Sequence, residues 1–298
     1  MLMLLSLLSL PLGLAAVETQ VAPHLALFLI LLASIGLPYF ILTTTSPLVQ
    51  YWIANDANLQ NVNPYVQYGI SNGGSLAGLL VYPFVLEPLL TTDSHRLIWT
   101  ITYLIYLAAL LASMWFFIKG NGGWHGANTP PNSVKSPNQL SRSLFSGIQP
   151  RWIFQAMIPS SLLLVITHYL TRDVVNFPLL WVVPLCIYLV TFVICFTLPN
   201  FIRPGKLRAL VTLLAVLALL LSTNPDMGLG FEGKVFFALL CLFFTCMVFH
   251  GDLERSKPHK LELTGFYLHL AAGGALGSIL VVVVAPVLFA STFEFYIV

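Results

Sequence analysis

The sequence predicts an all-α fold, a polytopic bundle of about eight membrane-spanning helices. Hydrophobic residues make up 58% of the 298 residues, and the mean hydropathy is +0.88. Charged residues make up only 8%, whereas about a quarter of a soluble domain of this length would be charged. Apolar runs long enough to cross a bilayer also recur along the whole chain.

The apolar runs define the expected helices one by one. A spanning helix needs roughly 20 apolar residues. Such runs cover residues 24–49, 65–90, 96–118, 152–170, 177–198, 207–223, 234–250 and 264–290. The apolar segment Met1–Ala16 is shorter and lacks the basic start of a signal peptide. It is interpreted as a short or partial helix, with a signal peptide as the alternative.

One long polar stretch divides the expected helices into two groups. Residues 120–150 are rich in glycine, proline and asparagine, which is typical of a loop. The predicted organisation is an N-terminal helix group (1–119), a linker loop (120–150) and a C-terminal helix group (151–298). Together they form one membrane domain, without a second soluble domain in the loop.

The distribution of basic residues predicts the orientation of the bundle. Cytoplasmic loops of membrane proteins carry an excess of lysine and arginine. With eight spans, only Arg96, Arg172 and Lys234 of the 13 basic residues lie on one side. The others lie on the opposite side, which predicts that the 120–150 loop is cytoplasmic and that Val298 is on the outer side. The low net charge of +2 gives no reason to expect a nucleic-acid partner.

Several stretches of the sequence resemble a known family in their order and spacing. They are LPYFILTTTSPLVQYW (37–52), NPYVQYGISNGGSLAGLLVYPFVLEPLL (63–90), IQPRWIFQAMIPSSLLL (148–164), RDVVNFPLLWVVPLCIYLVTF (172–192), FHGDLERSKP (249–258) and LTGFYLHLAAGGALGSILVVVVAPVLF (263–289). They resemble the membrane half of the bacterial membrane-fused spermidine synthase-like proteins. That half is a major-facilitator-like region joined to a synthase domain, and the resemblance covers nearly all of residues 24–292.

The resemblance implies a partial major-facilitator-like arrangement in a bacterial inner (plasma) membrane. On a twelve-helix plan, this chain begins around the third helix and stops before the last. The family's aminopropyl-transfer chemistry belongs to a synthase domain that lies C-terminal to the membrane part, and no segment here matches it. No catalytic residue is therefore assigned, and aminopropyltransferase-like activity is expected only if such a domain exists.

Four polar residues are candidates for substrate binding: Glu87, Asn72, His168 and Asp173. An ionisable group within a span is a functional candidate, and Glu87 lies near the end of the second run. It could equally reach the membrane interface. His168 and Asp173 could form a charged cluster with Arg172 at the mouth of a cavity, or Arg172 and Asp173 could be an exposed pair of little energetic weight.

Glycines within two spans are expected to pack helices together. Small residues let two helices approach closely in lipid. Gly74 and Gly78 form a small-xxx-small pair next to Asn72, and a second group comprises Gly273, Gly274 and Gly277. The second group is not interpreted as a dinucleotide loop, because it lies inside an apolar run with no strand before it.

The sequence predicts no cofactor and no metal site. His250, Asp252 and Glu254 are placed at the start of a loop, but their spacing matches no zinc pattern. Helix capping and contact with lipid phosphates explain them more simply. His269 could bind haem with another histidine, although a hydrogen-bonded histidine in the core is the favoured interpretation. The four cysteines are interpreted as small buried hydrophobes.

Three functions remain open from the sequence. The favoured one is a scaffold or accessory subunit that anchors or packs against a synthase-like domain or other membrane-complex subunits, with the lipid bilayer as its surroundings. The alternative is a major-facilitator-like transporter or binder of a small polar molecule such as a polyamine. A polyamine path should carry several acids at mid-membrane depth, and only Glu87 is close to meeting that requirement. A membrane enzyme ranks last.

Overall fold

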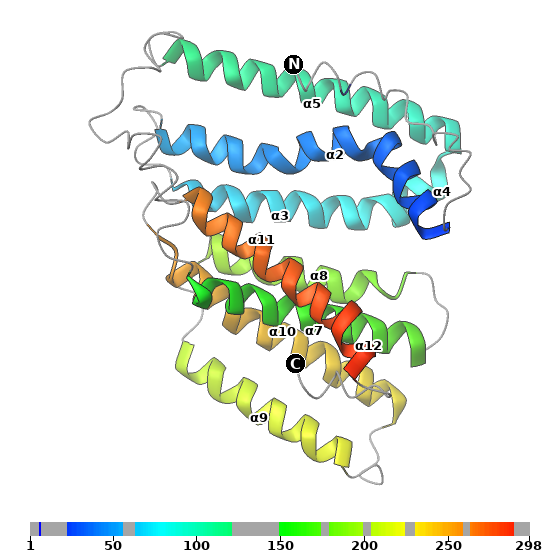
Figure 1. Cartoon of the computed structure of the whole chain (residues 1–298), viewed down its shortest axis with the longest axis vertical. Coiled ribbons are helices and arrows are strands. Elements are labelled where there is room, and N and C mark those ends of the chain that lie inside the picture. The colour runs from blue at the N-terminus through cyan, green and yellow to red at the C-terminus, as the bar shows by residue number, and fades with distance from the viewer. Residues whose placement is uncertain are drawn as a thin grey trace. The chain divides into compact units, whose positions relative to one another are not determined.

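The regular elements of the chain are all helical in the residues that the structure describes (Figure 1). The structure is a computed structural model, and it describes residues 6, 23–55, 63–120, 149–173, 179–198, 204–223, 230–258 and 263–288. The helices are α2 (Pro23–Asn55), α3 (Pro64–Val81), α5 (Thr92–Gly120), α7 (Pro150–Asp173), α8 (Val182–Thr197), α9 (Pro204–Thr223), α10 (Phe231–Arg255) and α11 (Leu263–Ile279). The Met1–Ala16 segment apart from Ser6, and nearly all of the 120–150 loop, lie outside the described residues.

Two of the helices continue through a π-helical turn. Helix α3 leads into η3 (Tyr82–Leu86) and α4 (Glu87–Leu89), and α11 leads into η6 (Leu280–Val284) and α12 (Ala285–Leu288). Pro83 lies in the first turn of η3, where it has no N–H to donate to the preceding turn. The wider turn keeps the helix continuous past this proline.

Six helices are long and apolar enough to cross a membrane, among the residues described. They cover Leu25–Gln50, Tyr65–Leu89, Thr92–Lys119, Pro150–Thr171, Glu232–Arg255 and Leu263–Val287. Helix α8 is also apolar, but its 16 residues rise only about 24 Å, less than the hydrocarbon core of a bilayer. The chain is therefore a membrane-embedded multi-pass protein. Helices lie at all eight predicted positions, but six of them, rather than about eight, qualify as membrane spans among the described residues.

The chain divides into two compact units, which are described separately. Unit 1 comprises Met1–Asn63 and Val81–Val134, and unit 2 comprises Pro64–Leu80 and Lys135–Val298. In unit 1, Ile41 of α2 is buried with Tyr103 and Leu107 of α5. The hydroxyls of Thr45 and Tyr106 share a hydrogen bond, which adds a polar contact to this apolar packing.

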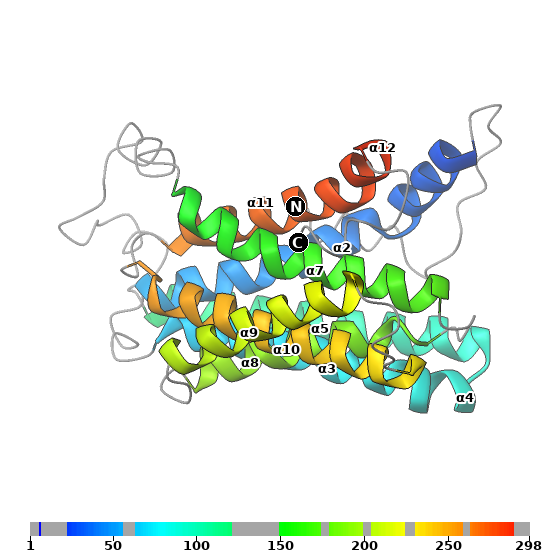
Figure 2. The same ribbon diagram turned by 90° about the horizontal axis from the view of Figure 1, so that it is seen from below.

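Unit 2 is built around the close pairing of α7 with α11, which run side by side in both views (Figures 1 and 2). Helix α10 packs against α7, α8 and α9. The core contains fully buried apolar side chains from three of these helices, including Ile166, Leu242 and Phe266. Apolar side chains on the outer faces remain exposed, as expected for helices surrounded by lipid.

The end of α10 differs from the expected position. The sequence places the end of this helix near residue 250 and assigns Asp252 and Glu254 to a loop. Helix α10 instead continues to Arg255, so both acids lie in its last turns and are buried. Each acid has a basic partner that compensates the loss of water around its charge: Arg208 of α9 for Asp252, a tertiary contact, and Lys257, three residues further along the chain, for Glu254.

Candidate functional site

The four residues expected to bind substrate lie on three helices, which belong to two units. Glu87 is exposed on α4 in unit 1. Asn72 lies on α3 in unit 2, and its Nδ2 donates to the carbonyl of Tyr68, one turn earlier, at 2.8 Å. His168 is exposed on α7. Asp173 is the last residue of that helix, and its side chain lies outside the described residues.

The two groups of glycines have different surroundings. A Cβ atom on Gly273 would meet the backbone carbonyl of Ile153, and one on Gly277 would lie 2.6 Å from the carbonyl of Met157. Helices α7 and α11 therefore meet at backbone distance along this face. A Cβ atom on Gly74 or Gly78 would meet nothing within 4 Å.

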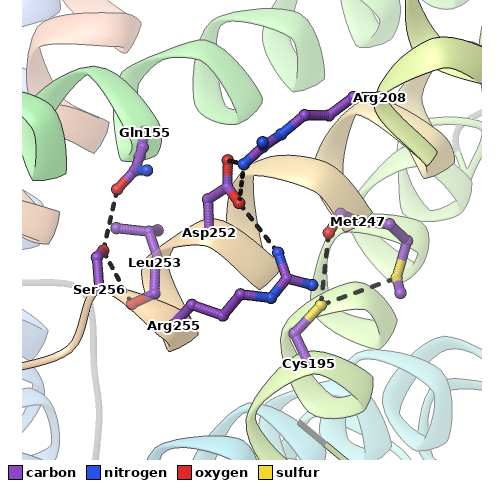
Figure 3. Close-up of polar contacts among 8 residues, drawn as sticks. All are labelled: Gln155, Cys195, Arg208, Met247, Asp252, Leu253, Arg255 and Ser256. Atoms are coloured by element: carbon purple, nitrogen blue, oxygen red, sulfur yellow. Dashed lines mark hydrogen bonds and ion pairs between the residues drawn. The ribbon is translucent and has the colours of Figure 1, made fainter. Parts of the chain in front are cut away.

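Charged and polar side chains converge at the C-terminal end of α10. Figure 3 shows Asp252 between two arginines, Arg208 and Arg255. We call these three residues the Asp252 cluster. Nη2 of Arg208 lies 2.7 Å from both carboxylate oxygens, and Nη1 of Arg255 lies 3.0 Å from Oδ1. Because Arg208 comes from α9, the pair joins the ends of two helices. The cluster thus fixes α9 on α10.

The second acid of this turn is paired as well. The carboxylate of Glu254, whose side chain is only 8% exposed, forms an ion pair with Lys257. The ammonium group of Lys257 also lies over the ring of Tyr65, 5.4 Å from its centre, in a cation–π arrangement. The hydroxyl of Tyr65 donates to the carbonyl of Pro258 at 2.7 Å. These contacts attach α3 to the segment that follows α10.

Ser256 connects the same segment to α7. Its hydroxyl lies 3.3 Å from Oε1 of Gln155, a contact that is also drawn in Figure 3. The indole Nε1 of Trp152 donates to the carbonyl of Ser256 at 3.2 Å. Contacts with α3, α7 and α9 therefore all meet within residues 252–258.

His250 lies two residues before Asp252 on α10 and is completely buried. Its ring stacks on Phe192 of α8, with 3.7 Å between ring centres, and meets Tyr188 edge to face. The hydroxyl of Thr191 donates to the carbonyl of Tyr188 at 2.7 Å, so its oxygen accepts from Nδ1–H of His250 at 3.0 Å. Nε2 has no hydrogen-bond partner in the part of the chain that is described.

Replacing Thr191 with valine tests the importance of this buried hydrogen bond. The substitution keeps the shape but leaves Nδ1 of His250 without an acceptor, and an unsatisfied buried polar group costs about 1–3 kcal/mol. The free energy of unfolding in detergent is expected to fall by that amount. Thr191→Ser keeps the hydroxyl and should lose clearly less, so equal losses in both variants would contradict this role.

His269, the histidine considered for haem, has both ring nitrogens engaged by the protein. Its Nε2 accepts from the backbone N–H of Gln149 at 3.1 Å, and Nδ1–H donates to the carbonyl of Gly265 at 2.7 Å. The first bond satisfies a backbone donor directly before the start of α7. His269 therefore holds the entry to α7 against α11.

The three possible metal ligands near the end of α10 are directed to different partners. His250 contacts Thr191, Asp252 contacts the two arginines and Glu254 contacts Lys257. No group of three or more histidine, cysteine, aspartate or glutamate side chains is placed to hold a metal within the described ranges. The chemistry that this arrangement supports is the joining of helix ends through paired charges and hydrogen bonds.

The sequence alone indicates the acidic residues of this cluster but not their partners. The group of His250, Asp252 and Glu254 stands out after an apolar run, and its charges suggested capping and contact with lipid phosphates. The pairing of Asp252 with Arg208 joins residues 44 positions apart and has no periodic signature. Comparisons of the chain with protein-family models, curated proteins and solved structures found no match.

Proposed function

We propose that this chain is the membrane module of a fused spermidine synthase-like protein, and that it acts as a scaffold for a synthase-like domain or for other subunits of a membrane complex. Its helices take a partial major-facilitator-like arrangement in a bacterial inner membrane, with the 120–150 loop in the cytoplasm. One observation carries the scaffold role: the two buried acids described in unit 2, Asp252 and Glu254, are each paired with basic side chains at the end of α10.

The positions of the ionisable groups favour a scaffold over a polyamine transporter. A path for a polycation needs acids that face a cavity and are ready to exchange partners. Asp252 and Glu254 are buried, and each is bound to a basic side chain of this chain. Glu87 is exposed and belongs to the other unit. A polyamine would have to break existing ion pairs to reach the buried acids.

The aromatic packing of unit 2 agrees with the same role. Tyr68 meets the rings of Phe192, Phe196 and Tyr267 at centre distances of 4.9 to 5.4 Å. Such contacts between α3, α8 and α11 add to the energy of area burial and favour one fixed arrangement. A fixed helix unit suits a module that holds a partner in place.

The first test is the intact mass of the native polypeptide, isolated gently from its own membrane with its co-purifying subunits. The scaffold proposal expects a synthase-like domain, either on the same polypeptide or as a stoichiometric subunit. A polypeptide of 32.9 kDa that is isolated alone would contradict it.

The second test is spermidine uptake into vesicles that contain the full chain, under an imposed proton gradient or membrane potential. Uptake is expected to equal that of vesicles without protein. Saturable uptake would overturn the scaffold proposal in favour of the transporter.

The substitution Glu87→Gln also distinguishes a transporter from a scaffold. Because Glu87 is exposed, this substitution should change the protein's free energy of unfolding by less than about 0.5 kcal/mol. Asp93→Asn, at another exposed acid near the start of α5, is the matched control. If Glu87→Gln but not Asp93→Asn abolished uptake by the full chain, Glu87 would be a transport residue and the scaffold role would be wrong.

A further inference from the structure

His269 holds the chain directly before α7 through a hydrogen bond that only a neutral ring can make. Its Nε2 accepts from the backbone N–H of Gln149 at 3.1 Å, and Nδ1 lies 2.7 Å from the carbonyl of Gly265, one turn earlier on α11. Because a carbonyl can only accept, the ring proton is on Nδ1 and the lone pair of Nε2 faces Gln149. Protonation of Nε2 would place two N–H groups against each other and remove this bond.

The contacts of Gln149 connect this ring to the first turn of α7. The carbonyl of Gln149 accepts from the backbone N–H of Trp152 at 3.1 Å. The indole of Trp152 meets the ring of His269 edge to face, with 5.5 Å between ring centres, and its Nε1 donates to the carbonyl of Ser256 at 3.2 Å. One hydrogen bond to His269 thus supports a series of contacts that runs from α11 through the start of α7 to the segment after α10.

The charged groups of the surrounding helices have other partners or are exposed. Among the described residues, His269 forms no ion pair with a carboxylate. The charged side chain in the first turn of α7 is Arg151, which is exposed. Beyond α10, Glu254 and Lys257 are paired with each other, and α3 meets this part of α11 with the ring of Tyr65. The hydrogen bond to the start of α7 is therefore the contact of His269 that a proton would change.

We propose that His269 is a pH-sensitive latch for the start of α7. The neutral ring holds Gln149 and the first turn of the helix, and the protonated ring releases both. Histidine is the side chain that ordinarily changes charge between about pH 5 and 8. The ring is half-buried and Gln149 is exposed, so a proton from water can reach this bond. Gln149 lies at the end of the 120–150 loop, so the latch transmits a change of pH to the junction between that loop and the helices. On the orientation proposed above, this junction faces the cytoplasm, but the latch does not depend on the scaffold role.

The test is hydrogen exchange of the full chain in micelles at about pH 7.5 and about pH 5.5, with labelling times scaled for the intrinsic pH dependence of exchange. Peptides that cover residues 149–158 are expected to open about ten-fold more often at the lower pH, the factor that corresponds to about one lost hydrogen bond. The part of α7 around the buried Ile166 should show no such change. Equal opening of residues 149–158 at both pH values would overturn the proposal.

His269→Gln and His168→Gln form a matched pair of single substitutions. The side-chain oxygen of a glutamine can accept from the N–H of Gln149 but does not gain a proton in this range. His269→Gln should therefore keep the start of α7 closed at both pH values. His168 is an exposed histidine on α7 itself, and its replacement should leave the ten-fold response unchanged. A response that survived in His269→Gln or disappeared in His168→Gln would show that His269 is not the latch.

Gln149→Pro tests the same bond from the donor side and decides the question if His269→Gln does not fold. Proline has no N–H, and the start of a helix tolerates it because no intrahelical bond is lost there. The first turn of α7 should then be open at both pH values, with no further opening on acidification. A ten-fold response in this variant would contradict the proposal, because the bond that the proton is said to break is absent.

Discussion

Gly273→Ala on α11 is expected to lower the free energy of unfolding by about 3 kcal/mol, the upper end of the cost of overpacking a close contact. The added Cβ atom would meet the backbone carbonyl of Ile153 and would lie 2.8 Å from the Cβ atom of Ala156. A backbone carbonyl within α7 cannot rotate away, so the two helices must separate. Thermal or SDS-induced unfolding of the full chain in micelles measures the loss.

Gly265→Ala is the matched control because it makes the same substitution on the same helix. A Cβ atom on Gly265 would meet nothing within 4 Å. Alanine is the better helix former, so this variant is expected to gain about 0.5–1 kcal/mol in stability. The two substitutions should therefore change the free energy of unfolding in opposite directions. If both raised stability, the close pairing of α7 with α11 would be wrong.

Asp252→Asn is expected to lower the free energy of unfolding by about 2 kcal/mol. Breaking a fully buried ion pair costs about 3–5 kcal/mol, and the partial exposure of Arg208 reduces that cost through solvent screening. The substitution leaves two guanidinium groups side by side without the carboxylate between them. Helix α9 should therefore detach first from α10, which hydrogen exchange of the two helices can detect.

A double-mutant cycle separates this pair from general effects of the substitution. Arg208→Gln in the Asp252→Asn background removes one of the two repelling cations, so it should cost about 1 kcal/mol less than it does alone. Glu232→Gln, at an exposed acid in the first turn of α10, is the control and should change stability by less than about 0.5 kcal/mol. Additive losses in the double variant would show that Arg208 and Asp252 are not coupled.

Much of the helical architecture could be predicted from the sequence because the bilayer imposes a simple rule. A backbone in lipid must satisfy its own hydrogen bonds, so each apolar run of about 20 residues becomes a helix. Runs such as 24–49 and 152–170 lie within α2 and α7. Length and hydropathy do not depend on distant parts of the chain. They determined that this protein is helical and embedded in a membrane.

Only the tertiary structure decided where α10 ends and which glycines lie between helices. Gly273 packs against α7 whereas Gly74 faces open space, although both occur in similar small-residue patterns. Asp252 remains helical and buried because Arg208, from a different helix, compensates its charge. A local pattern specifies that a residue is small or charged. Its partner is determined by contacts between segments far apart in sequence, and those contacts exist only once the helices have packed.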